Sequence, residues 1–318
     1  MKKTASSYIA SVAMLLVKYS ENRIQNIRSK RRRVTFYKTQ PAKTSRGARG
    51  ITDTVSNRII TLTTDFGLKD PYVAEMKAAI LGICPKATLV DITHEIEKFN
   101  IRMGAFVISC AAPYFPKGTI HVVVVDPSVG TRRRPILIET KQGFFVGPDN
   151  GVLILAAERA EIENLREITN KHFMLPEVSK TFQGRDVFAP VAAHLAKGIE
   201  TKEIGPHLSE VVRPFFTIVR SRKGVLIGEV LHLDGFGNII TNITAAQMAQ
   251  FGSCSQLEIE LGHRKLKFRF SKTYGEAERN EVLTLIGSHG YLEVAVNQGS
   301  AVEKFKAKQG DKITISPI

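Results

Sequence analysis

The chain has 318 residues, of which 43% are hydrophobic and 24% are charged, with 24 Gly and 13 Pro. This composition is typical of a globular protein long enough for two domains, and it excludes collagen, a coiled coil and a wholly disordered chain. The net charge is +15, and residues 1–58 hold 14 of the 45 basic residues against two of the 30 acidic ones. The rest of the chain, with 31 basic and 28 acidic residues, is nearly neutral.

The charge excess belongs to a basic arm, residues 1–57, which includes KRRR at 30–33 and has no sustained hydrophobic periodicity after Val17. We expect the arm to be disordered. We expect a cytoplasmic protein, with an organelle as the alternative, because a basic, acid-poor arm also resembles a targeting peptide. Nucleic-acid binding is disfavoured, because the arm lacks interleaved aromatic residues on which bases stack.

The three cysteines, Cys84, Cys110 and Cys254, contain no C-x-x-C pair, so neither a disulfide framework nor a zinc knuckle is predicted. A reducing compartment fits this usage. No apolar run approaches the roughly 20 residues that span a bilayer, so we expect no membrane association.

An α/β domain begins at residue 58, where a β-branched run ends abruptly in Asp65-Phe66-Gly67. Apolar strands and helices alternate from there, which predicts a mainly parallel sheet covered on both faces, with ligands beyond the carboxyl ends of its strands. The predicted strands are residues 58–64, 88–92, 119–125, 134–140 and 144–146, and the predicted helices are residues 72–81, 100–112 and 187–197.

From residue 223 the pattern changes to evenly spaced short strands, which predicts a small all-β barrel domain. These strands are residues 224–231, 239–243, 257–261, 265–270, 282–286, 292–296 and 312–316. The predicted division is therefore a basic arm at 1–57, an α/β domain at 58–204, a linker at 205–222 and a barrel domain at 223–318.

Carboxylates follow two of the predicted strands. Asp65 and Asp70 share one strand-to-helix loop, where they could bind a ribose diol or an ammonium, or could serve as a turn residue and a helix cap. Asp126 follows the most apolar strand and precedes three arginines, including Arg133. An Arg beside an Asp favours the ionised carboxylate, which suits orienting a water molecule, although a structural ion pair has the same pattern.

Other motifs carry less information. His94 with the nearby carboxylates is a weak candidate for a metal site, because no ligand pair such as H-x-x-x-H occurs. Asp149 and Asn150, in the turn GPDNG, are expected to bond the backbone. The glycine patterns of dinucleotide-binding and P-loop proteins are absent from the sequence, which disfavours both chemistries.

Taken together, seven segments resemble the S-adenosyl-L-methionine (SAM) hydrolases that form adenosine, the SAM hydroxide adenosyltransferases related to fluorinase and chlorinase. The resemblance extends from about Ile59 to Ile318 and leaves the basic arm outside. The segments that carry it are TLTTDFGLKDPYVAEMK, VDITHEI, PKGTIHVVVVDPSVGT, GPDNG, TFQGRDVFAPVAAHLA, DGFGNIITNI and GSHGYLEVAVNQGSA.

This resemblance implies an α/β domain followed by a β-barrel domain in a homotrimer. It implies hydrolysis of SAM at the 5′ carbon to adenosine and methionine, with no metal and no cofactor, at a site shared by neighbouring subunits. It implies that Asp65 binds the ribose diol. The methionine end would contact Asp70, Asp234, Ser288 and His289, and adenine would contact Asn238, Glu293 and the backbone near Val296 and Asn297.

The resemblance also implies that an Asp, an Arg and a His orient the attacking water. Asp126 and Arg133 match the first two, but Gln183 stands where the family has His. Because Gln can hydrogen-bond water but cannot take its proton near neutral pH, a protein that binds SAM or adenosine without turnover is the alternative function.

Overall fold

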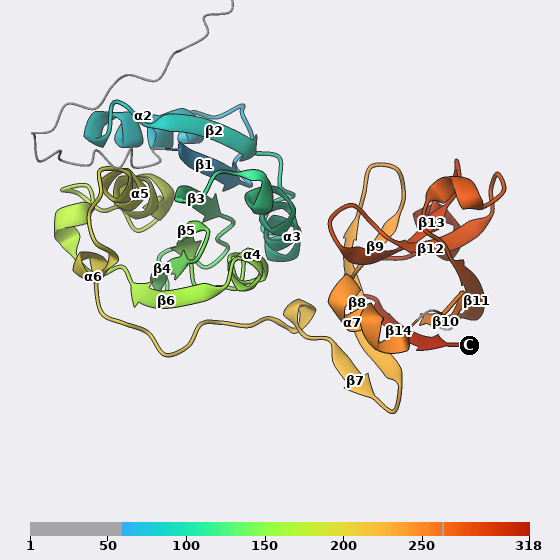
Figure 1. Cartoon of the computed structure of the whole chain (residues 1–318). Coiled ribbons are helices and arrows are strands. Elements are labelled where there is room, and N and C mark those ends of the chain that lie inside the picture. Colours follow the sequence, from blue (N-terminus) through green and yellow to red (C-terminus); the bar gives the residue numbers. More distant parts are fainter. Residues whose placement is uncertain (1–58, 253, 263) are drawn as a thin grey trace, which may run out of the picture. The chain divides into compact units, whose positions relative to one another are not determined.

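The computed structural model describes residues 59–252, 254–262 and 264–318, which form two domains (Figure 1). The first contains a six-stranded sheet in the order β2-β1-β3-β5-β4-β6. β4 runs antiparallel to both of its neighbours, and the other strand pairs of this sheet are parallel, so the predicted mainly parallel sheet is confirmed. The strands are β1 (Ile59–Thr64), β2 (Thr88–Thr93), β3 (Thr119–Val124), β4 (Pro135–Thr140), β5 (Gly143–Pro148) and β6 (Ile162–Glu167).

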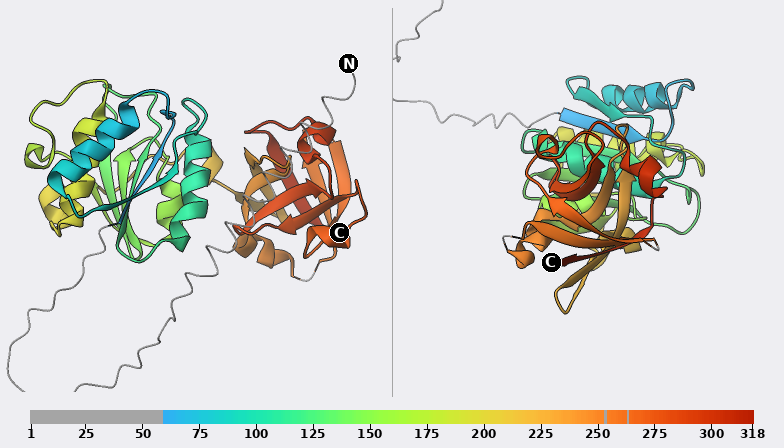
Figure 2. Two further views of the ribbon diagram at one scale, coloured as in Figure 1. Left: turned by 90° about the horizontal axis from the view of Figure 1, so that it is seen from above. Right: turned by 90° about the vertical axis from the view of Figure 1, so that its right-hand side faces the viewer.

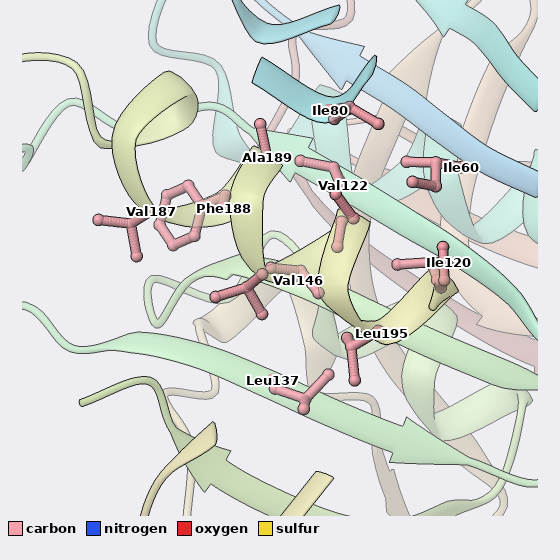
Figure 3. Close-up of a cluster of buried hydrophobic side chains, with 14 of the residues drawn as sticks. Ile60, Ile80, Ile120, Val122, Leu137, Val146, Val187, Phe188, Ala189 and Leu195 are labelled. Atoms are coloured by element: carbon pink, nitrogen blue, oxygen red, sulfur yellow. The ribbon is translucent and has the colours of Figure 1, made fainter. Parts of the chain in front are cut away.

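Helices cover both faces of this sheet (Figure 2). α2 (Tyr72–Ile83) and α5 (Ala189–Ala196) lie on one face, and α3 (Ile101–Ala111) and α4 (Ile154–Arg159) lie on the other. Successive side chains of β3 alternate between the two cores, with Val122 in the first and Val123 in the second. Figure 3 shows the first core. Each fully buried aliphatic side chain stabilises the fold by about 1.5–3 kcal/mol, so both helix layers are held firmly against the sheet.

The second domain is a closed seven-stranded barrel, which confirms the predicted all-β domain. Its order is β14-β10-β11-β12-β13-β9-β8, and pairing of β14 with β8 closes it. β7 (Arg220–Arg222) pairs with β8 outside the ring. The barrel strands are β8 (Val225–Leu233), β9 (Ile239–Thr244), β10 (Gln256–Leu261), β11 (Arg264–Phe270), β12 (Val282–Ile286), β13 (Tyr291–Val296) and β14 (Lys312–Pro317).

Several elements differ from the sequence predictions. β6 was not predicted because its apolar residues, Ile162 and Leu165, do not alternate, and its backbone pairing with β4 forms the strand instead. The predicted helix 187–197 is preceded by a π-helical turn, Gly184–Phe188. Three helices too short for a periodic signal are α6 (Thr201–Ile204), α7 (Ala245–Met248) and α8 (Ala301–Phe305). Single 3₁₀ turns lie at Ala112–Tyr114, Lys171–Phe173, Phe215–Thr217, Ala249–Phe251 and Tyr274–Glu276.

The predictions for the basic arm, residues 1–57, lie outside the described residues. Within the described ranges, none of the helices is long and apolar enough to cross a membrane.

Candidate active site

A cavity of about 370 Å³ lies where β1 and β3 end in the first domain. The parallel register places Thr64 opposite Val124, so the chain leaves both strands side by side at the same edge of the sheet. The structure thereby brings together four of the predicted site residues, which line the cavity: Asp65, Asp70, Asp126 and Gln183. Asp70 is exposed at this cavity, whereas Asp65 is only 5% exposed.

Asp65 is held by the loop that follows β2. The backbone N–H of Phe99 donates to Asp65 Oδ2 at 2.9 Å, and the Lys98 ammonium donates to the Asp65 carbonyl. In the described part of the chain no hydrogen bond is made to Asp65 Oδ1. A buried carboxylate with one oxygen fixed and one oxygen available can accept from a ligand hydroxyl.

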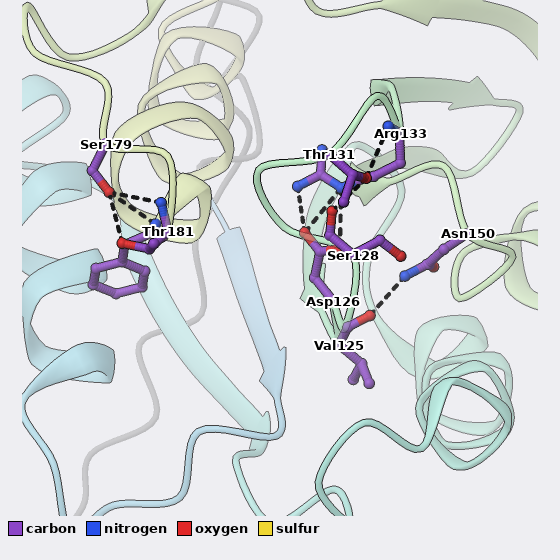
Figure 4. A network of polar contacts seen from close by, with 9 residues as sticks. Val125, Asp126, Ser128, Thr131, Arg133, Asn150, Ser179 and Thr181 are labelled. Carbon is purple, nitrogen blue, oxygen red and sulfur yellow. Dashed lines mark hydrogen bonds and ion pairs between the residues drawn. The ribbon is translucent and has the colours of Figure 1, made fainter.

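Asp126 forms a buried ion pair with Arg133 (Figure 4). Arg133 Nε lies 3.1 Å from Asp126 Oδ1 and 3.0 Å from Oδ2, and Nη2 also contacts Oδ2. The side chains are 5% exposed for Asp126 and 7% for Arg133. Asn150 supports the residue before this pair, because its side-chain amide donates to the Val125 carbonyl at 2.8 Å. The pair is therefore desolvated and fixed in orientation.

Two buried polar atoms of the predicted catalytic residues have no hydrogen-bond partner among the described residues, and of these residues Asp126 and Gln183 line the cavity whereas Arg133 lies behind Asp126. The two atoms are Arg133 Nη1, a donor, and Gln183 Oε1, an acceptor. Leaving such groups unpaired is unfavourable by about 1–3 kcal/mol each, so a bound molecule with both a donor and an acceptor would be favoured here. Water has both.

Gly130 allows the loop that carries Gln183 to approach the Asp126 loop. Its φ is +79°, and a Cβ at this position would lie 2.6 Å from the Lys180 carbonyl oxygen. On the other side of the loop, the fully buried Asp186 accepts from the Ser179 backbone N–H at 2.8 Å and from Arg185 Nε at 2.6 Å. Residues 179–183 are thus held at both sides, immediately before the π-helical turn.

An aromatic wall completes the cavity. Phe66, Tyr72 and Phe182 meet edge to face, with ring centroids 5.2 to 5.8 Å apart. Aromatic faces attract cations, and the surrounding rings exclude water. The cavity therefore combines an electron-rich apolar wall with a polar floor.

A second cavity, of about 850 Å³, is lined by residues of the barrel domain together with Phe106 of α3. It is lined by all seven of the site residues predicted in the barrel domain: Asp234, Asn238, Ser288, His289, Glu293, Val296 and Asn297. No residue lines both cavities. The predicted site thus consists of two groups of residues in each chain.

Asp234 organises the first loop of the second cavity. Its Oδ1 accepts from the backbone N–H groups of Phe236 and Asn238, both at 2.9 Å, and its Oδ2 accepts from the Asn238 side-chain amide at 2.9 Å. The side-chain nitrogen of Asn238 is therefore engaged, while its side-chain oxygen, Oδ1, can accept from a ligand amine.

Glu293 is a buried carboxyl in the same cavity, 5% exposed. Burial raises its pKa, and the nearby Asp234 charge raises it further, although the Tyr274 hydroxyl, which donates to Glu293 Oε2 at 2.7 Å, favours the ionised form. A Cβ on Gly287 would lie 1.7 Å from Glu293 Oε1, so the carboxyl group packs directly against that bare Cα.

The remaining predicted residues of this cavity differ in which of their polar groups are already hydrogen-bonded within the protein. Ser288 and His289 lie in the turn closed by the bond from Gly290 N–H to the Gly287 carbonyl, at 2.9 Å. Asn297 already uses its backbone N–H on Glu281 and its side-chain amide on Ala277. Asn297 therefore lines the cavity without a free backbone donor.

The chain matches known family models over most of its described length. The model of the SAM hydroxide adenosyltransferase N-terminal domain matches residues 60–205, and that of the C-terminal domain matches residues 228–314. The chain belongs to the SAM hydroxide adenosyltransferase family. The predicted resemblance is thereby confirmed.

Curated relatives of this chain include the (R)-S-adenosyl-L-methionine hydrolase of Methanocaldococcus jannaschii, 40% identical over 267 residues that cover 81% of this chain and 95% of that protein. A fluorinase of an Actinoplanes species is 30% identical over 293 residues, which cover 82% of this chain and 98% of the fluorinase. Among solved structures, an uncharacterized conserved protein of Thermotoga maritima matches with a TM-score of 0.73 and 39% identity, over 81% of this chain and 99% of that one.

Sequence reasoning missed the aromatic residues that line the cavities: Phe66, Tyr72, Phe99, Phe106, Phe182, Phe236 and Tyr274. Phe66 and Phe182 stand beside predicted site residues, which was the available signal. Asn150 and Asp149 both bond the backbone as predicted, since Asp149 Oδ1 accepts from the Val212 N–H at 2.8 Å, and Asp149 Oδ2 also pairs with Arg134. Among the described residues, no group of three or more His, Cys, Asp or Glu is arranged to hold a metal ion, so His94 joins no such cluster.

Proposed function

We propose that this chain hydrolyses SAM to adenosine and L-methionine. The observation that carries the proposal is the buried Asp126–Arg133 pair at a cavity that Asp126 and Gln183 line together, with Arg133 Nη1 and Gln183 Oε1 both buried and without a hydrogen-bond partner among the described residues. The relatives named as (R)-S-adenosyl-L-methionine hydrolases support it.

The reaction needs little from the protein beyond positioning. Water attacks the 5′ carbon, the carbon–sulfur bond breaks with its electron pair going to sulfur, and the attacking water loses one proton. Neutral methionine sulfur leaves readily, so no general acid is required. Holding the nucleophile in line with the breaking bond gains several kcal/mol, up to about 7–11 in well-oriented systems.

The unpaired atoms suit a water molecule in this role. Arg133 Nη1 would donate to the water oxygen, while Gln183 Oε1 and Asp126 would accept its hydrogens, leaving a lone pair for the carbon. Gln183 cannot take a proton near neutral pH, so Asp126 is the base of these three groups.

The binding roles follow from the chemistry of the two cavities. Asp65 would bind the ribose diol through Oδ1, and the Asn238 carbonyl oxygen with the Glu293 carboxyl would face the adenine amine. Asp70 and Asp234, with Ser288 and His289, would hold the methionine end. Val296 and Asn297 would supply wall surface beside adenine.

We propose a homotrimer in which the first-domain cavity of one subunit faces the barrel cavity of its neighbour. The separate lining of the two cavities supports this arrangement, as do aromatic side chains exposed beside each, Phe99 at 67% and Phe236 at 85%. Mass measurement in solution tests it, and an active monomer would contradict a shared site.

Incubation of the purified protein with SAM tests the activity. We expect release of equal amounts of adenosine and methionine, with the same rate after EDTA treatment, since we propose that no metal takes part. Calorimetric binding of SAM without product would instead select the binding-protein alternative.

The configuration at sulfur deserves a separate assay, because the relatives' names specify the (R) form. We propose the same preference here, since anchoring both the ribose and the amino acid leaves only one sulfonium face toward the aromatic wall. Separate assays with each epimer would reveal it as faster turnover of the (R) form.

A further inference from the structure

A chain of polar contacts runs behind the cavity and ends at the turn that carries Asp65. His94 follows β2 and is buried, 4% exposed. Its Nδ1 lies 2.9 Å from Thr64 Oγ1, at the last residue of β1. Thr64 Oγ1 also accepts from the Phe66 backbone N–H at 3.2 Å. A single hydroxyl therefore links His94 to both sides of Asp65.

The far side of His94 fixes the direction of these contacts. His94 Nε2 lies 3.1 Å from Asp91 Oδ1, and Lys77 donates to Asp91 Oδ2 at 2.6 Å. Burial raises the pKa of Asp91, but Lys77 and His94 outweigh that effect, so the pKa is lowered and the carboxylate is ionised at neutral pH. His94 Nε2 is close to Asp91 but outside hydrogen-bond geometry. The nearby negative charge favours a proton on Nε2, which makes Nδ1 the acceptor and the Thr64 hydroxyl the donor.

Hydrogen bonds from backbone N–H groups also connect the loop after β2 with the loop after β1. Gly67 N–H donates to the His94 carbonyl at 2.7 Å, and Phe99 N–H donates to Asp65 Oδ2 at 2.9 Å. The loop after β2 thus holds the loop after β1 at Thr64, Asp65 and Gly67. His94 is at the centre of this arrangement but does not line the cavity.

We propose that His94 is a positioning residue, which acts through Thr64 to aim Asp65 Oδ1 at the ribose diol. This inference rests on the proposed function, because it assigns the ribose to Asp65. It predicts that loss of the Thr64–His94 contact impairs recognition of the ribose hydroxyls rather than general binding of the nucleoside.

The sheet supplies a matched control. Thr61, also on β1, contacts the buried His121, with Oγ1 2.8 Å from Nδ1. Both threonines are fully buried and both histidines are 4% exposed. Neither Thr61 nor His121 lines the cavity. Thr61→Val and Thr64→Val each remove a buried Thr–His hydrogen bond. Thr64→Val also removes the bond from the Phe66 N–H, and only this variant lies beside Asp65.

The experiment compares the dissociation constants of adenosine and 2′-deoxyadenosine for each variant by calorimetry. In the wild-type protein we expect the deoxy compound to bind at least about tenfold more weakly, since a hydrogen bond to a charged group is lost. Thr64→Val should reduce this ratio to about threefold or less, whereas Thr61→Val should keep it. Thr64→Ser, which retains the hydroxyl, should restore it.

If Thr64→Val does not fold, two His94 variants distinguish the contact of Nδ1 with Thr64 from the contact of Nε2 with Asp91. His94→Asn places an acceptor near the position of Nδ1, and His94→Gln places a donor near the position of Nε2. We expect His94→Asn to keep the ratio of the two dissociation constants closer to its wild-type value than His94→Gln does. An unchanged ratio in both Thr64→Val and His94→Gln, with adenosine still bound, would overturn the positioning role alone. A wild-type protein that binds neither adenosine nor SAM would overturn the proposed function itself.

Discussion

Arg133 Nε lies 3.1 and 3.0 Å from the two carboxylate oxygens of Asp126, and both side chains are almost completely buried. The next residue, Arg134, makes a comparable contact, with Nε 2.8 Å from Asp149 Oδ2. The Asp149 side chain is also buried, but it does not line the cavity. Two adjacent arginines thus hold two carboxylates, of which only Asp126 lines the cavity.

Asp126→Asn should lower kcat by about 100-fold or more, because it removes both the base and the charge that orients Arg133. SAM affinity should change far less. Asp149→Asn is the matched control: it should reduce the free energy of unfolding yet leave kcat within about twofold, since that carboxylate does not line the cavity. Equal kcat losses in the two variants would argue against a catalytic role for Asp126.

Gly130→Ala should lower kcat, because its Cβ would collide with the Lys180 carbonyl and displace the loop that carries Gln183. Gly224→Ala is the control. Gly224 has a similar φ, +75° against +79° for Gly130, but nothing lies within 4 Å of its Cβ position. Both variants should lose about 1–3 kcal/mol of stability from the strained backbone. Steady-state kinetics should show a loss of kcat in Gly130→Ala alone.

Glu293→Gln should stabilise the protein more at pH 8 than at pH 5. The folded state raises the pKa of Glu293, so the folded protein binds this proton more tightly than the unfolded chain does. The stability that the protonated group contributes is present at low pH and is lost as the pH rises through the raised pKa. Gln mimics the protonated form at every pH and can still accept from Tyr274. Urea unfolding of both proteins at the two pH values measures the difference, and a larger benefit at pH 5 would contradict it.

Gln183 is the position at which the sequence departs from the family pattern. Gln183→Ala should reduce kcat by at most about tenfold, since a neutral hydrogen bond contributes only 0.5–1.5 kcal/mol. Gln183→His should increase the rate at pH 7 to 8 by about tenfold or more and add an ionisation near pH 6.5, because a general base is introduced. The pH–rate profiles of both variants provide the check. An unchanged profile in Gln183→His would mean that this side chain only positions water.

The sequence predicted the polar residues of the site better than its walls. Asp65 and Asp126 each follow an uninterrupted apolar strand, so the α/β pattern alone placed them at one edge of the sheet. The aromatic wall was not predictable in this way, because Phe66, Tyr72 and Phe182 meet only after α2 and the loop before α5 pack together.

Local sequence patterns also did not predict the contacts that hold Asp65 in place. His94 was considered as a metal ligand, since an isolated His after a strand carries no sign of its partners. Its contacts with Thr64 and Asp91 depend on the pairing of β1 with β2. The Phe99 N–H that holds Asp65 likewise comes from a loop without a recognisable motif.

The central claim, attack of water at the 5′ carbon of SAM, is tested most directly by reaction in ¹⁸O-labelled water with mass analysis of both products. We expect adenosine that carries one ¹⁸O atom in its 5′-hydroxyl group and methionine that carries none. Absence of adenosine, or adenosine without the label, would contradict the claim.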